Sequence, residues 1–187
     1  INVDDTKARH DGKNGYCTHV GNESFAFYES TESKSRINFL KILRAGRRDY
    51  VVNVDALIYM SENRLPKIAL ESLGEHFGIV LQNQNAWSEF LKTVGIEKPR
   101  HVQIATEGAL IGSLMEHGFN KDLVILSDDA GQFNVFLHAL CWIHAERSVN
   151  KLVGFNEEQK KVLETKKTEI WDFYKELKEY KEKPDPE

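Results

Sequence analysis

The chain has little cysteine and no long hydrophobic run, and both scarcities exclude whole classes of protein. Its 187 residues contain two cysteines, Cys17 and Cys141, which lie far apart in the sequence. Such a pair is no disulfide framework, so we expect a reducing, cytoplasmic environment. No apolar run approaches the roughly 18 residues that span a bilayer, so we expect no membrane partner.

The sequence also lacks an excess of positive charge. Its formal net charge is −4, which gives no overall attraction to nucleic acid. Any polyanion would therefore have to contact a local basic patch or metal ions. There is no glycine-rich phosphate loop and no G-x-S-x-G elbow. An initiator Met and a signal-peptide pattern are missing too, so we expect a piece of a longer protein.

What remains is enough for one domain with an appendage, because 41% of the residues are hydrophobic and 10% aromatic. Residues 1–6 are typical of a short strand, and the polar residues 7–15 of a turn or hairpin loop. Residues 16–30 give two strands broken at Gly21-Asn22, a dipeptide that favours a tight hairpin. The first 30 residues therefore predict an antiparallel three-strand meander.

Helices and strands alternate after the meander. Ser33 can cap a helix that Gly46 ends, and this helix belongs to the most basic segment of the chain. Residues 50–54 and 123–127 are apolar strands. The pattern further predicts two helices over 55–77 broken at Pro66, a helical second half of 77–96, a helix over 103–117, and a mostly helical stretch over 131–153.

Residues 154–187 are a different kind of sequence. They are dense in Lys and Glu, with apolar residues at helical spacing. We predict one or two amphipathic helices with ion pairs between residues four apart. The expected organisation is a core over 1–153 and a helical appendage over 154–187.

The order of elements predicts an α/β fold with a mixed sheet of about five strands flanked by helices. Right-handed crossovers would place strand 50–54 next to strand 1–6, and strand 123–127 beyond it. Asp4 and Asp5 would then lie near Asp128 and Asp129, at strand ends where ligands gather in open α/β sheets.

Two pairs of aspartates at the ends of apolar strands allow two interpretations. Carboxylates brought together repel unless a cation or proton lies between them, and Mg²⁺ takes one or two carboxylates plus substrate phosphates. Alternatively, Asp128 or Asp129 caps a following helix, and Asp4 and Asp5 are ordinary polar residues near a turn. Alternation along the strand separates Asp4 from Asp5 but does not tell which face carries the chemistry.

Four segments, spread over most of residues 3–152, form a recognisable set: VDDTKARHDGKNGYCTHVGN (3–22), STESKSRINFL (30–40), ILSDDAGQF (125–133) and HALCWIHAERSVNKL (138–152). Together they resemble a DDE transposase of the bacterial insertion-sequence group numbered 66. The family's first catalytic carboxylate matches Asp4, with Asp5 as the alternate. Its second matches Asp128, with Asp129 as the alternate. The family's C-W-x-H-x-x-R segment matches Cys141 to Arg147.

The resemblance implies a ribonuclease-H-like fold and Mg²⁺- or Mn²⁺-dependent cleavage and strand transfer of DNA at transposon ends. It implies DNA partners (transposon ends and target), a homo-oligomer in the transposition complex, and action at the bacterial nucleoid. The third catalytic residue, a Glu, is expected beyond residue 187. Glu146 is the nearest acid, but it falls where the family has a basic residue, so we do not assign it. We therefore expect this chain alone to be inactive.

Other functional residues remain open. His138, Cys141 and His144, with Cys17 and His19 elsewhere, could bind zinc, although packing in an apolar segment is the alternative. In the family interpretation, His144 and Arg147 support the active site or touch phosphate. The basic residues could neutralise DNA phosphates or form a solvated helix face; they are Lys34, Arg36, Lys41, Arg44, Arg47 and Arg48. The competing functions are another ribonuclease-H-like nuclease, such as a junction resolvase, and a DNA-binding module without catalysis.

Overall fold

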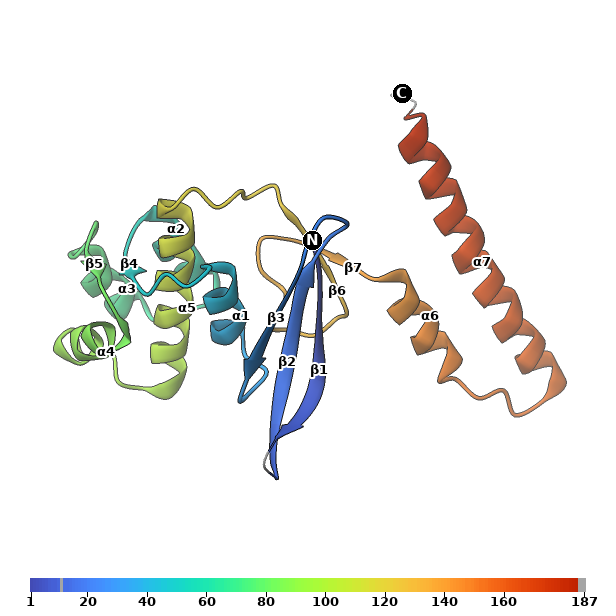
Figure 1. Ribbon diagram of the computed structural model, residues 1–187, viewed down its shortest axis with the longest axis horizontal. Helices are drawn as coiled ribbons and strands as arrows, with labels where there is room; N and C mark the ends of the chain where they lie inside the picture. Colours follow the sequence, from blue (N-terminus) through green and yellow to red (C-terminus); the bar gives the residue numbers. More distant parts are fainter. Residues whose placement is uncertain (11, 185–187) are drawn as a thin grey trace.

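The computed structural model describes residues 1–10 and 12–184, and its centre is a five-stranded mixed sheet (Figure 1). The strand order is β3-β2-β1-β6-β7. Strands β1 to β3 pair antiparallel, and β6 and β7 run parallel to β1. The bounds are β1 Asn2–His10, β2 Lys13–Gly21, β3 Ala26–Thr31, β6 Val124–Ser127 and β7 Leu137–Leu140. The predicted meander and mixed sheet are confirmed.

The first hairpin is longer than the sequence predicts. Residues 7–10 and 13–15, expected as a loop, continue the two strands, and the pairing extends to His10 opposite Lys13. Gly12 has a φ of +74°, which a residue without a Cβ adopts at little cost. Polar composition indicated a loop here because this end of the hairpin projects beyond the other strands, where both faces meet water (Figure 1).

The connection between β2 and β3 lies where Gly21-Asn22 predicted it. The Asn22 side chain accepts hydrogen bonds from the backbone N–H groups of Ser24 and Phe25, at 2.8 and 3.2 Å. The backbone of Asn22 also donates to the carbonyl of Phe25 at 2.9 Å. These bonds replace the strand ladder through the turn, which is the usual contribution of asparagine at such positions.

The neighbour of β1 differs from the prediction. Residues Tyr50–Val51 form β4, which pairs with β5 (Val80–Leu81) in a separate small sheet. Asn53 explains why β4 is short, since its side chain accepts from the N–H of Ala56 and so begins the next helix. The expected placement of strand 50–54 beside β1 is therefore wrong. The edge of β1 pairs directly with β6 instead.

Strand β7 is a second correction, because residues 131–153 were expected to be mostly helical. Residues 137–140 pair with β6 over its whole length, and only α6 (Trp142–Asn150) is helical. The apolar pattern of so short a segment does not distinguish a buried strand from a helix. The free edge of β6 provides the hydrogen bonds that decide between them.

Helix α1 (Arg36–Leu43) packs between the sheet and a unit of helices. Its N-cap is Ser35, whose side chain accepts from the N–H of Asn38 at 3.2 Å, so the predicted cap at Ser33 is wrong. Ala45 and Gly46 end the helix with φ values of +52° and +85°. The helices of that unit are α2 Val54–Glu62, α3 Lys67–Gly74, α4 Gln84–Thr93 and α5 Pro99–Glu116. The break at Pro66 is confirmed.

One hydrophobic core joins the sheet to the helical unit. It runs from Val3 and Val20 of the sheet through Phe39 of α1 to Leu110 of α5. Helix α5 is buried from residue 104 to 114 and lies against β4. Gly112 permits this contact, because a Cβ at that position would lie 2.3 Å from the carbonyl oxygen of Val51. Close packing of this kind makes α5 the central helix of the unit.

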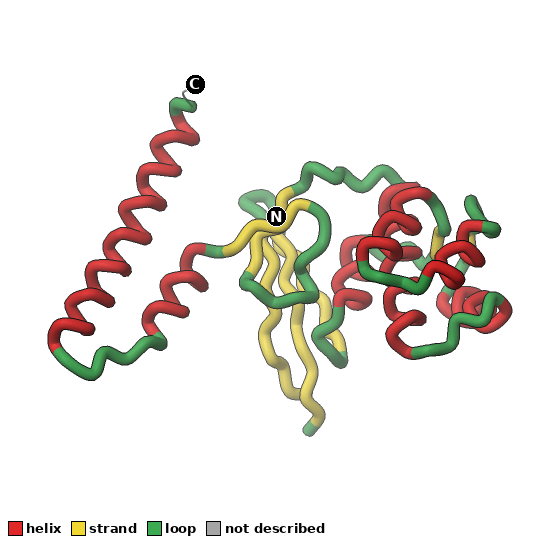
Figure 2. Tube along the Cα trace, turned by 180° about the vertical axis from the view of Figure 1, so that it is seen from behind, coloured by secondary structure: helices red, strands yellow, loops and turns green. Residues whose placement is uncertain are grey.

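The C-terminal helices stand apart from this core. Helices α6 and α7 (Glu157–Glu182) have no buried residue and lead away from the β7 edge, while the helical unit lies on the other side of the sheet (Figures 1 and 2). Trp142 packs against Phe173 and Tyr174, with ring centroids 5.8 and 5.9 Å away. The α7 ion pairs, all at a spacing of three rather than the predicted four, are Glu157–Lys160, Glu164–Lys167, Lys166–Glu169 and Asp172–Lys175. No helix in the described part of the chain is both long and apolar enough to cross a membrane.

Candidate functional site

The parallel pairing of β1 with β6 brings the two aspartate pairs to the same level of the sheet. Asn2 of β1 is the partner of Leu126 of β6. Asp4 follows Asn2 by two residues, and Asp128 follows Leu126 by two residues, directly after the end of β6. Neighbouring strands lie about 4.8 Å apart, so the two segments that contain the aspartates are close in space. The expected proximity of the two strands is present, but through a direct β1–β6 pair.

Asp4 and Asp5 face opposite sides of the sheet. Asp4 is exposed and pairs across the hairpin with His19, whose ring packs on Tyr28 with centroids 4.9 Å apart. Asp5 lies on the face that α1 covers, where one carboxylate oxygen accepts from Thr18 at 2.5 Å and the other from Gln132 at 2.8 Å. Asp5 is thus a structural tie, whereas Asp4 keeps a carboxylate oxygen available on the open face.

Asp128 begins a loop and does not cap a helix. Residues 128–136 contain no helix, so the expectation of a following helix is wrong. The Oδ1 atom of Asp128 accepts from the N–H of Ala130 at 3.1 Å, a local turn that aspartate commonly makes. Its second oxygen has no partner among the described residues, and the neighbouring Asp129 is exposed.

Three contacts hold this loop against the body of the protein. Gln132 bonds to Asp5 on β1, and Phe133 is buried against Phe39 of α1 with an edge-to-face centroid distance of 5.1 Å. From α1, Arg36 donates to the carbonyl oxygen of Gly131 at 2.6 Å. Side chains from β1 and α1 therefore hold residues 131–133 of the loop against the body of the protein.

Arg36 belongs to a buried polar network. Its guanidinium lies 3.5 Å from the Glu107 carboxylate of α5 and donates to the hydroxyl of Tyr59 on α2 at 2.9 Å. Tyr59 in turn donates to Glu107 at 2.5 Å, and Gln103 donates to the same carboxylate at 2.9 Å. Burial, followed by the Glu107 carboxylate, raises the pKa of Tyr59. This network joins α1, α2 and α5 to the Asp128 loop.

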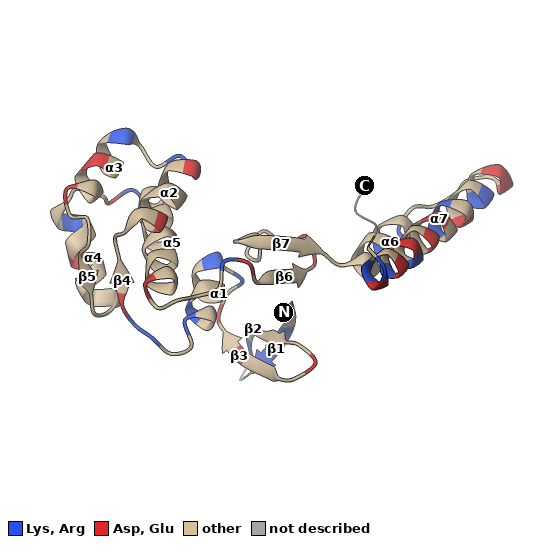
Figure 3. Ribbon diagram, turned by 90° about the horizontal axis from the view of Figure 1, so that it is seen from above, with Lys and Arg blue, Asp and Glu red and all other residues tan. Residues whose placement is uncertain are grey.

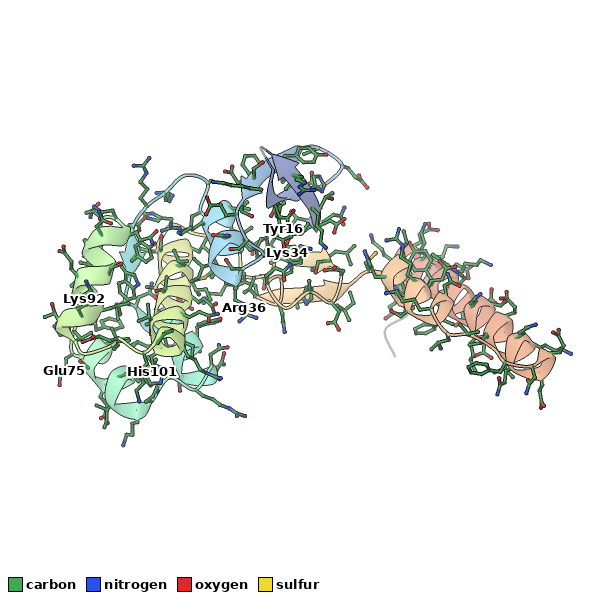
Figure 4. The ribbon with its side chains drawn as sticks, turned by 90° about the horizontal axis from the view of Figure 1, so that it is seen from below. Tyr16, Lys34, Arg36, Glu75, Lys92 and His101 are labelled. Atoms are coloured by element: carbon green, nitrogen blue, oxygen red, sulfur yellow. The ribbon has the colours of Figure 1, made fainter. Side chains whose placement is uncertain are left out.

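Figure 4 shows Arg36 extending from α1 toward the segment that contains β6 and β7. The sequence left Arg36 as a phosphate contact or part of a solvated helix face, and its bonds to Tyr59, Glu107 and Gly131 give it a positioning role within the protein. Glu107 was given no role from the sequence, since one glutamate in a helix carries no motif, yet it is 2% exposed. Gln132 was equally overlooked. Its only sequence signal is its place four residues after Asp128.

The other basic residues have different environments. Lys34 lies beside Tyr16, with its ammonium 5.4 Å from the ring centroid, and contacts the backbone oxygen of Asp5 at 3.4 Å (Figure 4). Arg44 is buried, whereas Arg47 and Arg48 are exposed in the loop before β4. Figure 3 shows this loop as a blue stretch between α1 and β4. The segment is therefore not a single solvated helix face.

The residues of the C-W-x-H-x-x-R segment begin at the same end of the sheet as Asp128. The N–H of Cys141 donates to the carbonyl oxygen of Ser127 at 2.9 Å, so the start of α6 adjoins the end of β6. His144 is half-buried and its Nδ1 has no hydrogen-bond partner within residues 1–10 and 12–184, while Arg147 is exposed in the last turn. Neither side chain contacts the aspartates among the interactions of the described residues.

The donor set suits a hard divalent cation with few protein ligands. Asp4 and Asp128 provide carboxylate oxygens, which Mg²⁺ and Mn²⁺ prefer. Within residues 1–10 and 12–184, no group of three or more His, Cys, Asp or Glu side chains lies close enough to hold a metal ion. The Nε2 atom of His138, one of the candidate zinc ligands, lies 2.7 Å from the hydroxyl oxygen of Ser127. The carboxylate pair thus fits an ion that takes its remaining ligands from water and substrate.

Comparison with known proteins gives one relative without an assigned function. The chain is 39% identical over 188 residues to the uncharacterized protein y4jO of Sinorhizobium fredii. The alignment covers all of this chain and 59% of that relative, so the chain spans less than two thirds of its length. No family model matches the chain, and no solved structure matches it.

Proposed function

We propose that this chain is the catalytic core of a DDE-type transposase of the insertion sequence 66 type, with a ribonuclease-H-like sheet. In the full-length protein it would cleave DNA at transposon ends and transfer the strand to a target. The observation that carries the proposal is the parallel pairing of Asn2 with Leu126, from which we infer that Asp4 and Asp128 lie near one another. The mixed sheet, with an antiparallel meander beside parallel strands, supports it.

The proposed roles follow from the contacts of each residue. Asp4 and Asp128 would hold the divalent ion, whose chemistry is to activate the attacking oxygen and stabilise the leaving oxygen of a phosphodiester. Asp5, Gln132 and Arg36 keep the Asp128 loop against β1 and α1, and in this proposal they position Asp128. Such positioning suits a reaction dominated by electrostatics.

The chain alone is expected to bind metal weakly and to cut DNA poorly, since it offers two acids where the proposed chemistry uses three. The described residues contain no group of three Asp, Glu, His or Cys side chains placed to hold a metal ion. This observation favours a second candidate, a DNA-binding module without catalysis.

A manganese titration of the chain tests the first step. We expect Asp4→Asn and Asp128→Asn each to weaken Mn²⁺ binding by on the order of 10-fold or more, because each removes a charged ligand. Asp129→Asn, an exposed neighbour, is the matched control and should bind as the wild type does. Equal Mn²⁺ affinity in all four proteins would overturn the metal site and favour the module without catalysis.

Cleavage by the full-length protein tests the reaction and distinguishes the nucleases. Transposon-end DNA, RNA–DNA hybrids and four-way junctions are supplied with Mg²⁺. Cutting of transposon ends supports the transposase, whereas preference for junctions supports a resolvase. Strong cutting of transposon ends by the 187-residue chain would show that the expected Glu is not needed.

A further inference from the structure

A basic pocket lies in the helical unit, apart from the aspartates. It has a volume of about 440 Å³ and is formed by the end of α1, the loop before β4 and the start of α4. Its lining residues are Lys41, Arg44, Gly46, Arg47, Arg48, Tyr50, Asn83, Gln84 and Asn85. Four of them are cations and none is an acid, so the pocket concentrates positive charge in a chain whose net charge is negative.

Arg44 is the most informative of these residues. It is 5% exposed, donates to the backbone oxygen of Asp49, and lies with its guanidinium 5.2 Å from the ring centroid of Tyr50. Its Nε is buried and has no hydrogen-bond partner among the described residues. Burial lowers the pKa of Arg44, and the nearby Tyr50 and Asp49 offset this only in part. An anion in the pocket would give the unpaired Nε a partner and compensate the buried charge.

Lys41 extends the same argument to the pocket wall. Burial, and then the charge of Arg44, lowers the pKa of Lys41. The ammonium donates to the side-chain oxygen of Gln84 at 3.1 Å, which fixes it across the pocket mouth. Two neighbouring cations are therefore held together in a pocket whose lining contains no acid, an arrangement that favours an anionic ligand.

Helix α4 adds backbone donors. Asn83 caps the helix by accepting from the N–H of Ala86 at 3.0 Å. The N–H groups of Gln84 and Asn85 belong to the first turn, where an α-helix has no internal acceptors. The first turn contains no acidic residue. The positive end of the helix dipole and these amides thus adjoin the cations, a combination that suits phosphate.

We propose that this pocket binds a phosphate group of a nucleic-acid backbone. Guanidinium, ammonium and helix N-terminal amides together form the donor set that recognises phosphate oxygens. The choice of nucleic acid as the source rests on the proposed function, whereas the anion site itself rests on the buried Arg44 and the pocket around it. The pocket would anchor DNA on the helical unit while the aspartates act at the sheet.

Oligonucleotide binding in EDTA tests the pocket independently of the metal site. The 187-residue chain is titrated against labelled single- and double-stranded oligonucleotides and followed by fluorescence anisotropy. We expect Lys41→Gln/Arg48→Gln to weaken binding about 5- to 20-fold and to reduce the slope of log affinity against log salt by about 1. The control Lys92→Gln/Arg100→Gln removes the same charge elsewhere on the helical unit and should change binding less than about twofold.

Each outcome decides the proposal. Equal losses in the two double variants, or none in the first, would overturn it. Pyrophosphate should compete with the oligonucleotide on the wild type. Pyrophosphate binding without oligonucleotide binding would refute the nucleic-acid source and identify a small phosphate compound as the ligand class.

Asp4→Asn should bind the oligonucleotide normally, which separates this test from failure of the metal site. Arg48→Gln alone, at an exposed position, repeats the test if the double variant melts early.

Discussion

Gln132, in the loop after β6, donates a hydrogen bond of 2.8 Å to the carboxylate of Asp5 on β1. The other oxygen of that carboxylate accepts from Thr18 on β2 at 2.5 Å. Asp5 therefore connects β1 to β2 and to the Asp128 loop by hydrogen bonds, while Asp4 lies on the exposed face. The two adjacent aspartates have separate roles because neighbouring side chains on a strand point to opposite faces.

Replacing Gln132 with Ala should loosen the loop that carries Asp128. We expect the free energy of unfolding to fall by about 1–2 kcal/mol, because Asp5 loses a hydrogen bond in a half-buried place. If the proposed metal site is right, Mn²⁺ affinity should fall on the order of 10-fold through the displaced Asp128. Urea unfolding and Mn²⁺ titration measure the two effects. Gln82→Ala, at an exposed position, is the control; a normal Mn²⁺ affinity in Gln132→Ala would limit that residue to a stabilising role.

Replacing Arg36 with Met should destabilise the protein by about 3–5 kcal/mol, because Glu107 would remain buried without its cation. The double variant Arg36→Met/Glu107→Gln removes the uncompensated charge and should recover part of this loss. Thermal and urea unfolding of both proteins, with Glu107→Gln alone to complete the cycle, give the coupling energy. Strictly additive effects of the two changes would contradict a direct Arg36–Glu107 interaction.

Alanine substitutions at two helical glycines are expected to have opposite effects on stability. Gly112→Ala should destabilise the fold by about 1–3 kcal/mol or more, because the added Cβ would meet the carbonyl of Val51 on β4. Gly74→Ala in α3 meets no atom within 4 Å and should stabilise by about 0.5–1 kcal/mol through helix propensity. Circular dichroism melts of both variants test the close packing of α5. A Gly112→Ala protein as stable as the wild type would show that α5 does not lie against β4.

Lowering the pH should reduce the stability of the fold, because Asp49 becomes protonated. Burial alone would raise the pKa of Asp49, but hydrogen bonds from His117 at 3.0 Å and Ser113 at 3.1 Å lower it below its ordinary value of 3.8. A carboxylate with a lowered folded pKa contributes stability that is fully present above 3.8 and is lost as the pH falls below that value. Asp49→Asn should therefore show a shallower loss of stability between about pH 4 and pH 2. Identical pH profiles of the two proteins would contradict this account.

Much of the local structure could be read from short-range chemistry. Gly21-Asn22 located the turn between β2 and β3, Pro66 located the break between α2 and α3, and the Lys/Glu pattern located α7. In each case the deciding interaction lies within a few residues of the chain. The errors at 7–15, 50–54 and 137–140 have a different origin, because those segments take their structure from partners distant in the sequence.

The aspartates were found by their positions at the ends of apolar strands, and their roles were not. Choosing Asp4 over Asp5 required the faces of β1, which α1 and Gln132 define. Arg36 looked like one of several surface cations until Glu107 and Tyr59 surrounded it. The pocket around Arg44 could not be anticipated, since Asn83 and Gln84 come from a helix about 40 residues further along the chain.

The sequence alone determined the composition of the strands and helices, the two pairs of aspartates and the local excess of basic residues. Only the tertiary structure decided that β6 lies beside β1 and that Arg44 is buried in a pocket with other cations. The physical reason is the sequence separation of the groups that interact. Turn and capping bonds form between neighbours in the chain, whereas strand pairing, burial and charge clustering depend on which distant segments pack together.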